Sequence, residues 1–370
     1  MQPVMRTVVL IAAIGTAFAP AAAVADIGIG LAAPLSGAFQ PLGAEMKAGA
    51  EAAIADINAA GGILGQPLKL EAFDDACDTK QAVLVAGQLS AAHVAFVDGH
   101  LCSGASIAAA AAYAAAHIVQ ISPASTAAAY TDDRAGPGTF RLAGREDRQG
   151  GVAGTYLAHV FAGKSVAFLD DKTAYGHGLT KAALAAFDAA GQKETLTQSY
   201  DAGAKSYAAL AAVLAAANVD AVYVGGAAAD IAAIVRALKD KGERPSIVGG
   251  DTLTDDDFFK AAGDASDGVV MTALPDLRIA PSSAALVAAF RQRQIEPAGY
   301  TLYSYAAVQI WAQAAAQAKS SEYGKVSAAI ASGTFNTALG PVKFDAEGDA
   351  VLPGYALYVW KNGDFTQLAP

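Results

Sequence analysis

Short apolar runs alternate with longer stretches of helical periodicity along most of the chain. Apolar runs bounded by glycine, proline or polar clusters predict buried strands, and the longer stretches between them predict helices. The predicted strands are Ile27–Ala33, Leu68–Phe73, Ala95–Asp98, Ile118–Ile121, Ser165–Leu169, Glu194–Tyr200, Ala221–Val224 and Ser246–Gly249. The predicted helices are Gly43–Ala60, Thr79–Ala91, Ser106–Ala116, Gly178–Ala190, Tyr207–Ala217 and Ala228–Lys241. Alternation of this length predicts an α/β fold with parallel sheets covered by helices on both faces.

The strand–helix pattern occurs in two series, which predicts two doubly wound parallel-sheet lobes with a cleft between them. In open α/β sheets, ligands bind beyond the carboxyl ends of the strands, so the loops that follow strands are candidate sites. The pattern changes beyond residue 272. Ala284–Gln294 and Tyr303–Lys319 predict helices, and Gly340–Gln367 predicts short strands with a hairpin turn at Asn362-Gly363.

Residues 1–25 have the three parts of a secretory signal peptide. Arg6 supplies the positive charge, Val8–Ala19 is the apolar segment, and Ala23–Ala25 provides small residues for cleavage. A membrane anchor is the alternative. However, a spanning helix needs about 20 apolar residues, and Pro20 interrupts this segment before that length is reached. We therefore expect export to the periplasm, with a mature chain that begins at Asp26.

Composition and charge exclude several classes of protein. Lysine and arginine total 25 against 35 acidic residues, for a net charge of -10, which disfavours nucleic acid as a partner. Hydrophobic residues make up 54% of the chain, as in a folded globular protein. Cys77 and Cys102 each follow a predicted strand, and neighbouring strand ends would allow a disulfide in an exported protein. Two free buried cysteines are the alternative.

No catalytic, metal or cofactor motif is evident. Gly28–Ala33 matches the dinucleotide pattern G-x-G-x-x-A, but its glycines lie inside the first predicted strand, whereas the motif should follow a strand. The five histidines lack the spacing of metal ligands. Asp74-Asp75 and Asp255–Asp257 lack the glycine and glutamate of a calcium loop. With no nucleophile–base pair either, we expect neither an enzyme nor a bound cofactor.

Polar loops after three strands are the remaining candidates for chemistry. Gly99–Gly104 precedes an alanine-rich helix, where the Ser103 hydroxyl and backbone N–H groups could hold an anion. Ser122–Thr126 follows the next strand and offers hydroxyl groups, and Asp251 follows a strand of the second series. An ordinary helix cap is the alternative at each position.

Together these segments resemble the type I periplasmic binding proteins, specifically the leucine/isoleucine/valine group that serves ABC transporters. The resemblance covers nearly the whole mature chain. It rests on APLSG at Ala33–Gly37, GAEAAIADINAAGGILG at Gly49–Gly65, DDACDTKQAV at Asp74–Val83, DGHLCSG at Asp98–Gly104, ISPASTA at Ile121–Ala127, AYGHGL at Ala174–Leu179, VYVGG at Val222–Gly226 and GPVKFDAEGD at Gly340–Asp349. It implies a monomeric receptor whose two lobes close on an amino acid and are then recognised by a membrane permease.

The resemblance also implies how the chain is divided. Residues 26–145 and 276–348 would form lobe 1, and residues 146–275 and 349–370 would form lobe 2. The chain would then cross between the lobes three times at the hinge. The family bridges the two cysteines, so Cys77 and Cys102 would form a disulfide.

Ligand contacts in lobe 1 can be carried over from the family residue by residue. Ser103 would bind the α-carboxylate through its hydroxyl and N–H groups, and Leu101 and Cys102 belong to the same loop of the site. Thr126 would bind the carboxylate and the amine. The Ala124 carbonyl would accept a hydrogen bond from the ammonium group.

The remaining site residues include three departures from the family. Tyr175 would pack on the ligand and Tyr300 would close the pocket near the hinge. Asp251 stands where the family uses a glutamate to pair with the ammonium group, and it is one methylene shorter. Two replacements would enlarge the pocket, since Leu42 and Ala227 stand where the family has aromatic residues: often an aromatic residue at 42, and a tyrosine at 227.

A larger pocket leaves open a second function, a receptor of the same fold for an aromatic or other small carboxylate. Asp251 distinguishes the two, because an acid that faces a ligand without an amine would be unpaired and costly.

Overall fold

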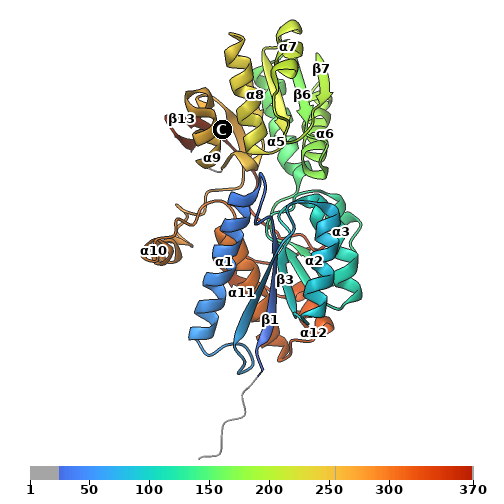
Figure 1. The fold of residues 1–370 in the computed structure, drawn as a ribbon, viewed down its shortest axis with the longest axis vertical. Helices are drawn as coiled ribbons and strands as arrows, with labels where there is room; N and C mark the ends of the chain where they lie inside the picture. Colours follow the sequence, from blue (N-terminus) through green and yellow to red (C-terminus); the bar gives the residue numbers. More distant parts are fainter. Residues whose placement is uncertain (1–24, 255, 369–370) are drawn as a thin grey trace, which may run out of the picture.

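The computed structural model describes residues 25–254 and 256–368. The signal-peptide segment lies outside the described residues apart from Ala25. The chain forms two α/β lobes stacked end to end (Figure 1). No helix within the described residues combines the length and hydropathy needed to span a bilayer.

Lobe 1 is built on a five-stranded parallel sheet with the order β2-β1-β3-β4-β5. Its strands are β1 (Ile27–Ala33), β2 (Leu68–Asp74), β3 (Phe96–Gly99), β4 (Val119–Ser122) and β5 (Thr139–Arg141). One face packs on α2 (Thr79–Ala91) and α3 (Ser103–Ala115). The other packs on α1 (Gln40–Ala59), α11 (Thr301–Ala318) and α12 (Tyr323–Ser332). Burial on both faces explains why these strands are continuous apolar runs.

Lobe 2 contains a seven-stranded sheet with the order β14-β13-β10-β9-β8-β6-β7. Its strands are β6 (Val166–Asp170), β7 (Leu196–Ser199), β8 (Ala221–Gly225), β9 (Ser246–Gly249), β10 (Val270–Ala273), β13 (Ala356–Lys361) and β14 (Asp364–Gln367). Within this described sheet, β13 runs antiparallel to both of its neighbours, β10 and β14, and the other strand pairs are parallel. Its faces are covered by α5 (Glu146–Val160) and α6 (Ala174–Ala189) on one side, and by α7 (Ala208–Ala216), α8 (Ala228–Asp240) and α9 (Asp256–Ala262) on the other.

Shorter elements complete the described chain. They are α4 (Ala129–Asp132), the 3₁₀ turns η1 (Asp251–Thr254) and η2 (Gly263–Ser266), α10 (Ala284–Gln292), and the antiparallel pair β11 (Phe335–Thr337) and β12 (Gly340–Val342).

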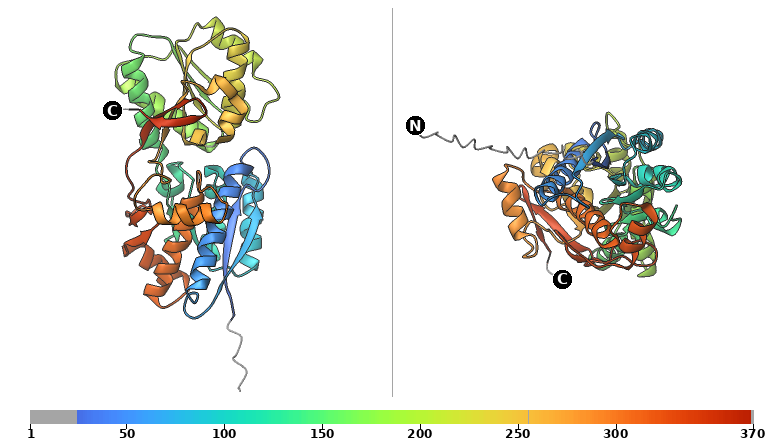
Figure 2. Two further views of the ribbon diagram at one scale, coloured as in Figure 1. Left: turned by 90° about the vertical axis from the view of Figure 1, so that its left-hand side faces the viewer. Right: turned by 90° about the horizontal axis from the view of Figure 1, so that it is seen from below.

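Three connections join the lobes. The chain passes from β5 to α5, from β10 to α10 and α11, and from β12 to β13. Figure 2 shows the result, with the red C-terminal strands beside the green and yellow helices of lobe 2, and the orange helices in lobe 1. The α/β class and the two parallel-sheet lobes predicted from the sequence are confirmed. The boundaries at 145, 275 and 348 stay a prediction.

Several helices begin earlier than the sequence predicts, and two of them carry expected site residues in the added turn. α3 begins at Ser103 rather than Ser106, and α6 begins at Ala174 rather than Gly178. Ser103 and Tyr175 therefore lie in the first turn of a helix and not in the loop before it. Backbone N–H groups are unpaired in a first turn, so both residues stand where an anion is favoured.

Candidate functional site

A cavity of about 270 Å³ lies between the lobes, at the carboxyl ends of the strands. Lobe 1 contributes mainly apolar and small residues, and lobe 2 faces them with polar ones. The lining residues are Phe39, Leu42, Cys77, Thr79, Leu101, Cys102, Ser103, Gly104, Ala124, Lys172, Thr173, Ala174, Tyr175, Thr252 and Tyr300. This is the position at which an open α/β sheet binds its ligand.

Two hydroxyl groups of lobe 1 have unused hydrogen-bonding capacity. The Ser103 Oγ accepts hydrogen bonds from the N–H groups of Thr126 (3.2 Å) and Ala127 (3.1 Å). Accepting these bonds leaves the Ser103 proton available for donation to a ligand. The Thr126 Oγ1 is buried and has no hydrogen-bond partner in the described part of the chain. The two hydroxyl groups therefore have bonding capacity that the protein does not use.

A disulfide and a buried histidine fix the start of α3. Cys77 and Cys102 are bonded with their Cα atoms 5.5 Å apart, as the resemblance implied. His100 Nδ1 lies 2.6 Å from Asp75 Oδ2, and its Nε2 lies 3.1 Å from the Tyr113 hydroxyl. All three side chains of this network are buried. Ser103 is thus attached to a rigid segment.

Asp251 of lobe 2 is held by three side chains. Its Oδ1 accepts from the Tyr175 hydroxyl (2.9 Å) and from Gln149 Nε2 (3.0 Å), and its Oδ2 accepts from the Tyr300 hydroxyl (2.6 Å). Burial, together with the charge of Asp251, raises the pKa of both tyrosines well above the usual value, so they remain donors. Tyr300 precedes α11 of lobe 1, and its bond to Asp251 therefore spans the two lobes.

This arrangement corrects one expectation. We expected Asp251 to be unpaired, and therefore costly, opposite a ligand that lacks an amine. It already accepts three hydrogen bonds from the protein, so its presence alone does not exclude such a ligand.

The family model described as "Periplasmic binding protein" matches residues 26–364. The chain belongs to this family. It is 41% identical to the Leu/Ile/Val-binding protein homolog 1 of Brucella abortus, over 92% of this chain and 91% of that protein. The relationship to the leucine/isoleucine/valine group expected from the sequence is thereby confirmed.

Solved structures agree on the fold of the periplasmic binding protein. A leucine binding protein from Thermotoga maritima has a TM-score of 0.84 at 22% identity, over 93% of this chain and 98% of that one. A branched-chain amino acid transporter substrate binding protein from Streptococcus pneumoniae, in complex with isoleucine, has a TM-score of 0.83 at 24% identity. The match covers 93% of this chain and 100% of the Streptococcus pneumoniae protein.

The binding-protein fold brings together most of the residues expected in the site. Leu42, Leu101, Cys102, Ser103, Ala124, Tyr175 and Tyr300 line the cavity. Asp251 lies behind the two tyrosines and borders a smaller cavity of about 70 Å³ at the hinge. Thr126 is buried under Ser103 and is not among the lining residues.

The two positions expected to enlarge the pocket differ in their placement. Leu42 lines the cavity, whereas Ala227 is buried at the start of α8 and is not among the lining residues. Sequence analysis also missed Phe39, which lines the cavity beside Leu42. A large aromatic residue in the loop after the first strand was the signal that could have revealed it.

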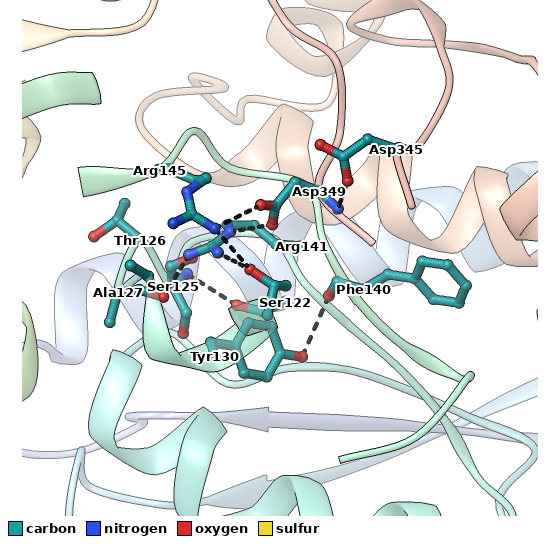
Figure 3. A network of polar contacts seen from close by, with 12 residues as sticks. Ser122, Ser125, Thr126, Ala127, Tyr130, Phe140, Arg141, Arg145, Asp345 and Asp349 are labelled. Atoms are coloured by element: carbon teal, nitrogen blue, oxygen red, sulfur yellow. Dashed lines mark hydrogen bonds and ion pairs between the residues drawn. The ribbon is translucent and has the colours of Figure 1, made fainter. Parts of the chain in front are cut away.

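A network of charges at the hinge holds the ligand loop Ser122–Ala128 (Figure 3). The buried Arg141 donates from Nε to Asp349 Oδ1 (2.7 Å) and from Nη1 to the Ala127 carbonyl (2.7 Å). Arg145 donates from Nη1 to Asp349 Oδ2 (3.1 Å). Asp349 belongs to the connection between β12 and β13, so the network ties two connections to the loop that carries Thr126.

Proposed function

We propose that this protein is the extracytoplasmic receptor of an ABC importer and binds an amino acid with an apolar side chain between its lobes. The observation that carries the proposal is the composition of the cavity. Ser103 offers a donor on one side, Phe39, Leu42 and Leu101 supply an apolar surface, and Tyr175 and Tyr300 on the other side bond Asp251 directly behind them. The names of the relatives, which are Leu/Ile/Val-binding proteins, support it.

A zwitterion must have both charges satisfied once it is buried. The Ser103 hydroxyl and the N–H groups of the first turn of α3 would receive the carboxylate, with the Thr126 hydroxyl beside them. The Ala124 carbonyl and the Asp251 carboxylate would accept from the ammonium group. Charge-assisted hydrogen bonds of this kind are stronger than neutral ones.

Lobe closure would report ligand binding to the permease. Contacts with Ser103 and Asp251 come from different lobes, so a ligand forms both only when the lobes are close together. Such a ligand shifts the equilibrium toward the closed arrangement. The mature chain would begin at Asp26 and act as a monomer in the periplasm.

A second candidate function is a receptor for an aromatic or other small carboxylate. The specific observation in its favour is the hydrogen bonding of Asp251, whose three protein donors remain when the ligand has no amine.

Thermal unfolding in the presence of single ligands separates the two candidates, because a ligand bound only by the folded protein raises Tm. The screen contains the twenty amino acids together with benzoate and phenylacetate, and calorimetry on each hit measures Kd. We expect L-leucine, L-isoleucine or L-valine to raise Tm. A response to the aromatic acids alone would establish the second candidate instead.

A further inference from the structure

Glu146 occupies a position between the lobes that the family resemblance does not assign. It is the first residue of α5, it is 6% exposed, and its backbone N–H donates to the Thr126 carbonyl (2.9 Å). Its Oε1 accepts from the Ala128 N–H (3.4 Å). Its Oε2 is buried and has no hydrogen-bond partner among the described residues.

The carboxyl group of Glu146 also packs against lobe 2. A Cβ atom added to Gly178 of α6 would lie 2.0 Å from Glu146 Oε1, so any side chain there would displace the carboxyl group. The same helix carries Tyr175, while Thr126 and Ala128 belong to the ligand loop of lobe 1. Glu146 therefore contacts both moving parts of the site through one side chain.

Charged and titratable groups surround Glu146 on each packed element. Burial is the main influence and raises the pKa of Glu146 to about 7, although the Ala128 N–H, Arg141 and Arg145 oppose it. The other groups that interact with it are Asp147 on its own helix, Tyr223 on β8 and Tyr355 on the last connection. Arg141 and Arg145 already bind Asp349, and neither donates a hydrogen bond to Glu146 within the described residues.

We propose that Glu146 is a positioning residue that couples protonation of its carboxyl group to lobe closure, so that acidification through neutral pH favours the closed arrangement. We take the described structure, in which the Tyr300 hydroxyl of lobe 1 bonds Asp251 of lobe 2, as the closed arrangement. There the carboxyl group is buried with one oxygen unpaired, which disfavours its charged form. Opening of the lobes would separate the ligand loop from α5 and α6 and admit water to the Glu146 carboxyl group. Its pKa would then return toward the ordinary value for a glutamate.

The direction of the effect follows from linkage. A group that binds its proton more tightly in one arrangement stabilises that arrangement at low pH and loses the contribution as pH rises through the higher pKa. Closure is therefore favoured well below pH 7 and weakened above it. For one linked proton, ligand affinity changes by at most about tenfold per pH unit.

Small-angle X-ray scattering of the ligand-free protein between about pH 5.5 and about pH 8.5 tests the coupling without any ligand. We expect the radius of gyration of the wild type to fall on acidification. Glu146→Gln imitates the protonated group, so it should remain compact at every pH. Asp147→Asn, which changes the neighbouring and half-exposed acid, is the matched control and should follow the wild type.

Titration with L-leucine over the same pH range adds a second readout, and this arm rests on the proposed function. The wild type should bind more tightly as pH falls, and Glu146→Gln should bind independently of pH. If L-leucine does not bind at any pH, the proposed function is in error, while the scattering result still decides the coupling.

Two results would overturn the proposal. One is a pH response that Glu146→Gln retains in full, which would assign it to another buried acid such as Asp98 or Asp171. The other is a wild type that shows no response. If Glu146→Gln does not fold, carboxyl ¹³C NMR of the wild type can measure the pKa of Glu146 directly. An ordinary glutamate pKa for this group would contradict the coupling.

Discussion

At the scale of single residues, the hydroxyl groups of Ser103 and Thr126 differ in the hydrogen bonds that they make within the protein. Ser103 Oγ accepts from two buried N–H groups, so Ser103→Ala leaves both unpaired. The Thr126 hydroxyl has no such partner in the described chain, so Thr126→Val keeps the shape of the side chain and should remove only the proposed ligand contact. We expect Thr126→Val to weaken L-leucine binding by about ten- to a hundredfold with Tm retained. Ser103→Ala should lower both quantities.

Calorimetry and thermal unfolding on the two variants check this difference. Unchanged affinity in Thr126→Val would mean that the carboxylate and amine bind elsewhere. An equal fall in Tm for both variants would contradict the separate roles of the two hydroxyl groups.

Asp251 is the residue at which the two candidate functions separate. Removing one member of a buried ion pair costs about 3–5 kcal/mol, or at least a hundredfold in affinity, so Asp251→Asn should lose most amino-acid binding. Tyr300→Phe keeps the acid and removes only the bond across the lobes, so its loss should be smaller. A lowered Tm with wild-type affinity in Asp251→Asn would show that the acid only holds the tyrosines, in favour of the aromatic-carboxylate receptor.

At the scale of helices and strands, the sequence predicts best where periodicity and propensity agree. Ile27–Ala33, Thr79–Ala91 and Ser246–Gly249 are found with the predicted bounds. α5 was not predicted, because Gly150, Gly151 and Gly154 are poor helix formers. Packing explains two of them, since a Cβ at Gly154 would lie 2.0 Å from the Ala183 carbonyl oxygen and one at Gly150 2.6 Å from the Ala182 Cβ. Close contact between α5 and α6 is a tertiary requirement that local pattern does not reveal.

The disulfide acts on the element that carries Ser103. Cys102 precedes α3, and its bond to Cys77 closes a loop with a sequence separation of 25. Loss of this crosslink in Cys77→Ser/Cys102→Ser should destabilise the protein by about 3 kcal/mol through the entropy of the unfolded chain. Weaker ligand binding should accompany it, because the start of α3 loses its attachment.

Urea unfolding of the double variant and thiol titration of the unreduced, unfolded wild type check the disulfide together. Two reactive thiols in the wild type would establish the free-cysteine alternative. Identical unfolding curves would show that the His100 network alone holds the start of α3.

At the scale of the whole molecule, the two lobes depend on contacts between residues far apart in the chain. Arg141 and Asp349 are separated by 208 positions, and Tyr300 and Asp251 by 49. Neither pair has a local signal, so the sequence predicts the lobes and the ligand loops but not the bonds that join them. The resemblance placed Asp251 and Tyr300 in the site, and only the structure reveals that they contact each other.

The ion pairs of Asp349 with Arg141 and Arg145 at the hinge connect the lobes to the ligand loop. Burial raises the pKa of Asp349, but the charge of Arg141 and the hydrogen bonds from Arg141, Thr131 and Arg145 together outweigh it, so the pKa lies below the usual value. Asp349 therefore stabilises the fold at neutral pH, and its contribution is lost as pH falls through that lowered pKa. Asp349→Asn leaves the fully buried Arg141 without its counter-charge, which should cost about 3–5 kcal/mol at pH 7.

Urea unfolding at neutral and acidic pH measures this contribution. Asp147→Asn is the matched control, because Asp147 is a half-exposed partner of Arg145 and its loss should cost less than about 1 kcal/mol. The difference between wild type and Asp349→Asn should shrink in acid, where the wild-type carboxylate is itself neutralised. Equal stability of the two Asp→Asn variants at pH 7 would show that Arg141 is held by the carbonyl groups of the ligand loop alone, and that the ion pair does not join the lobes.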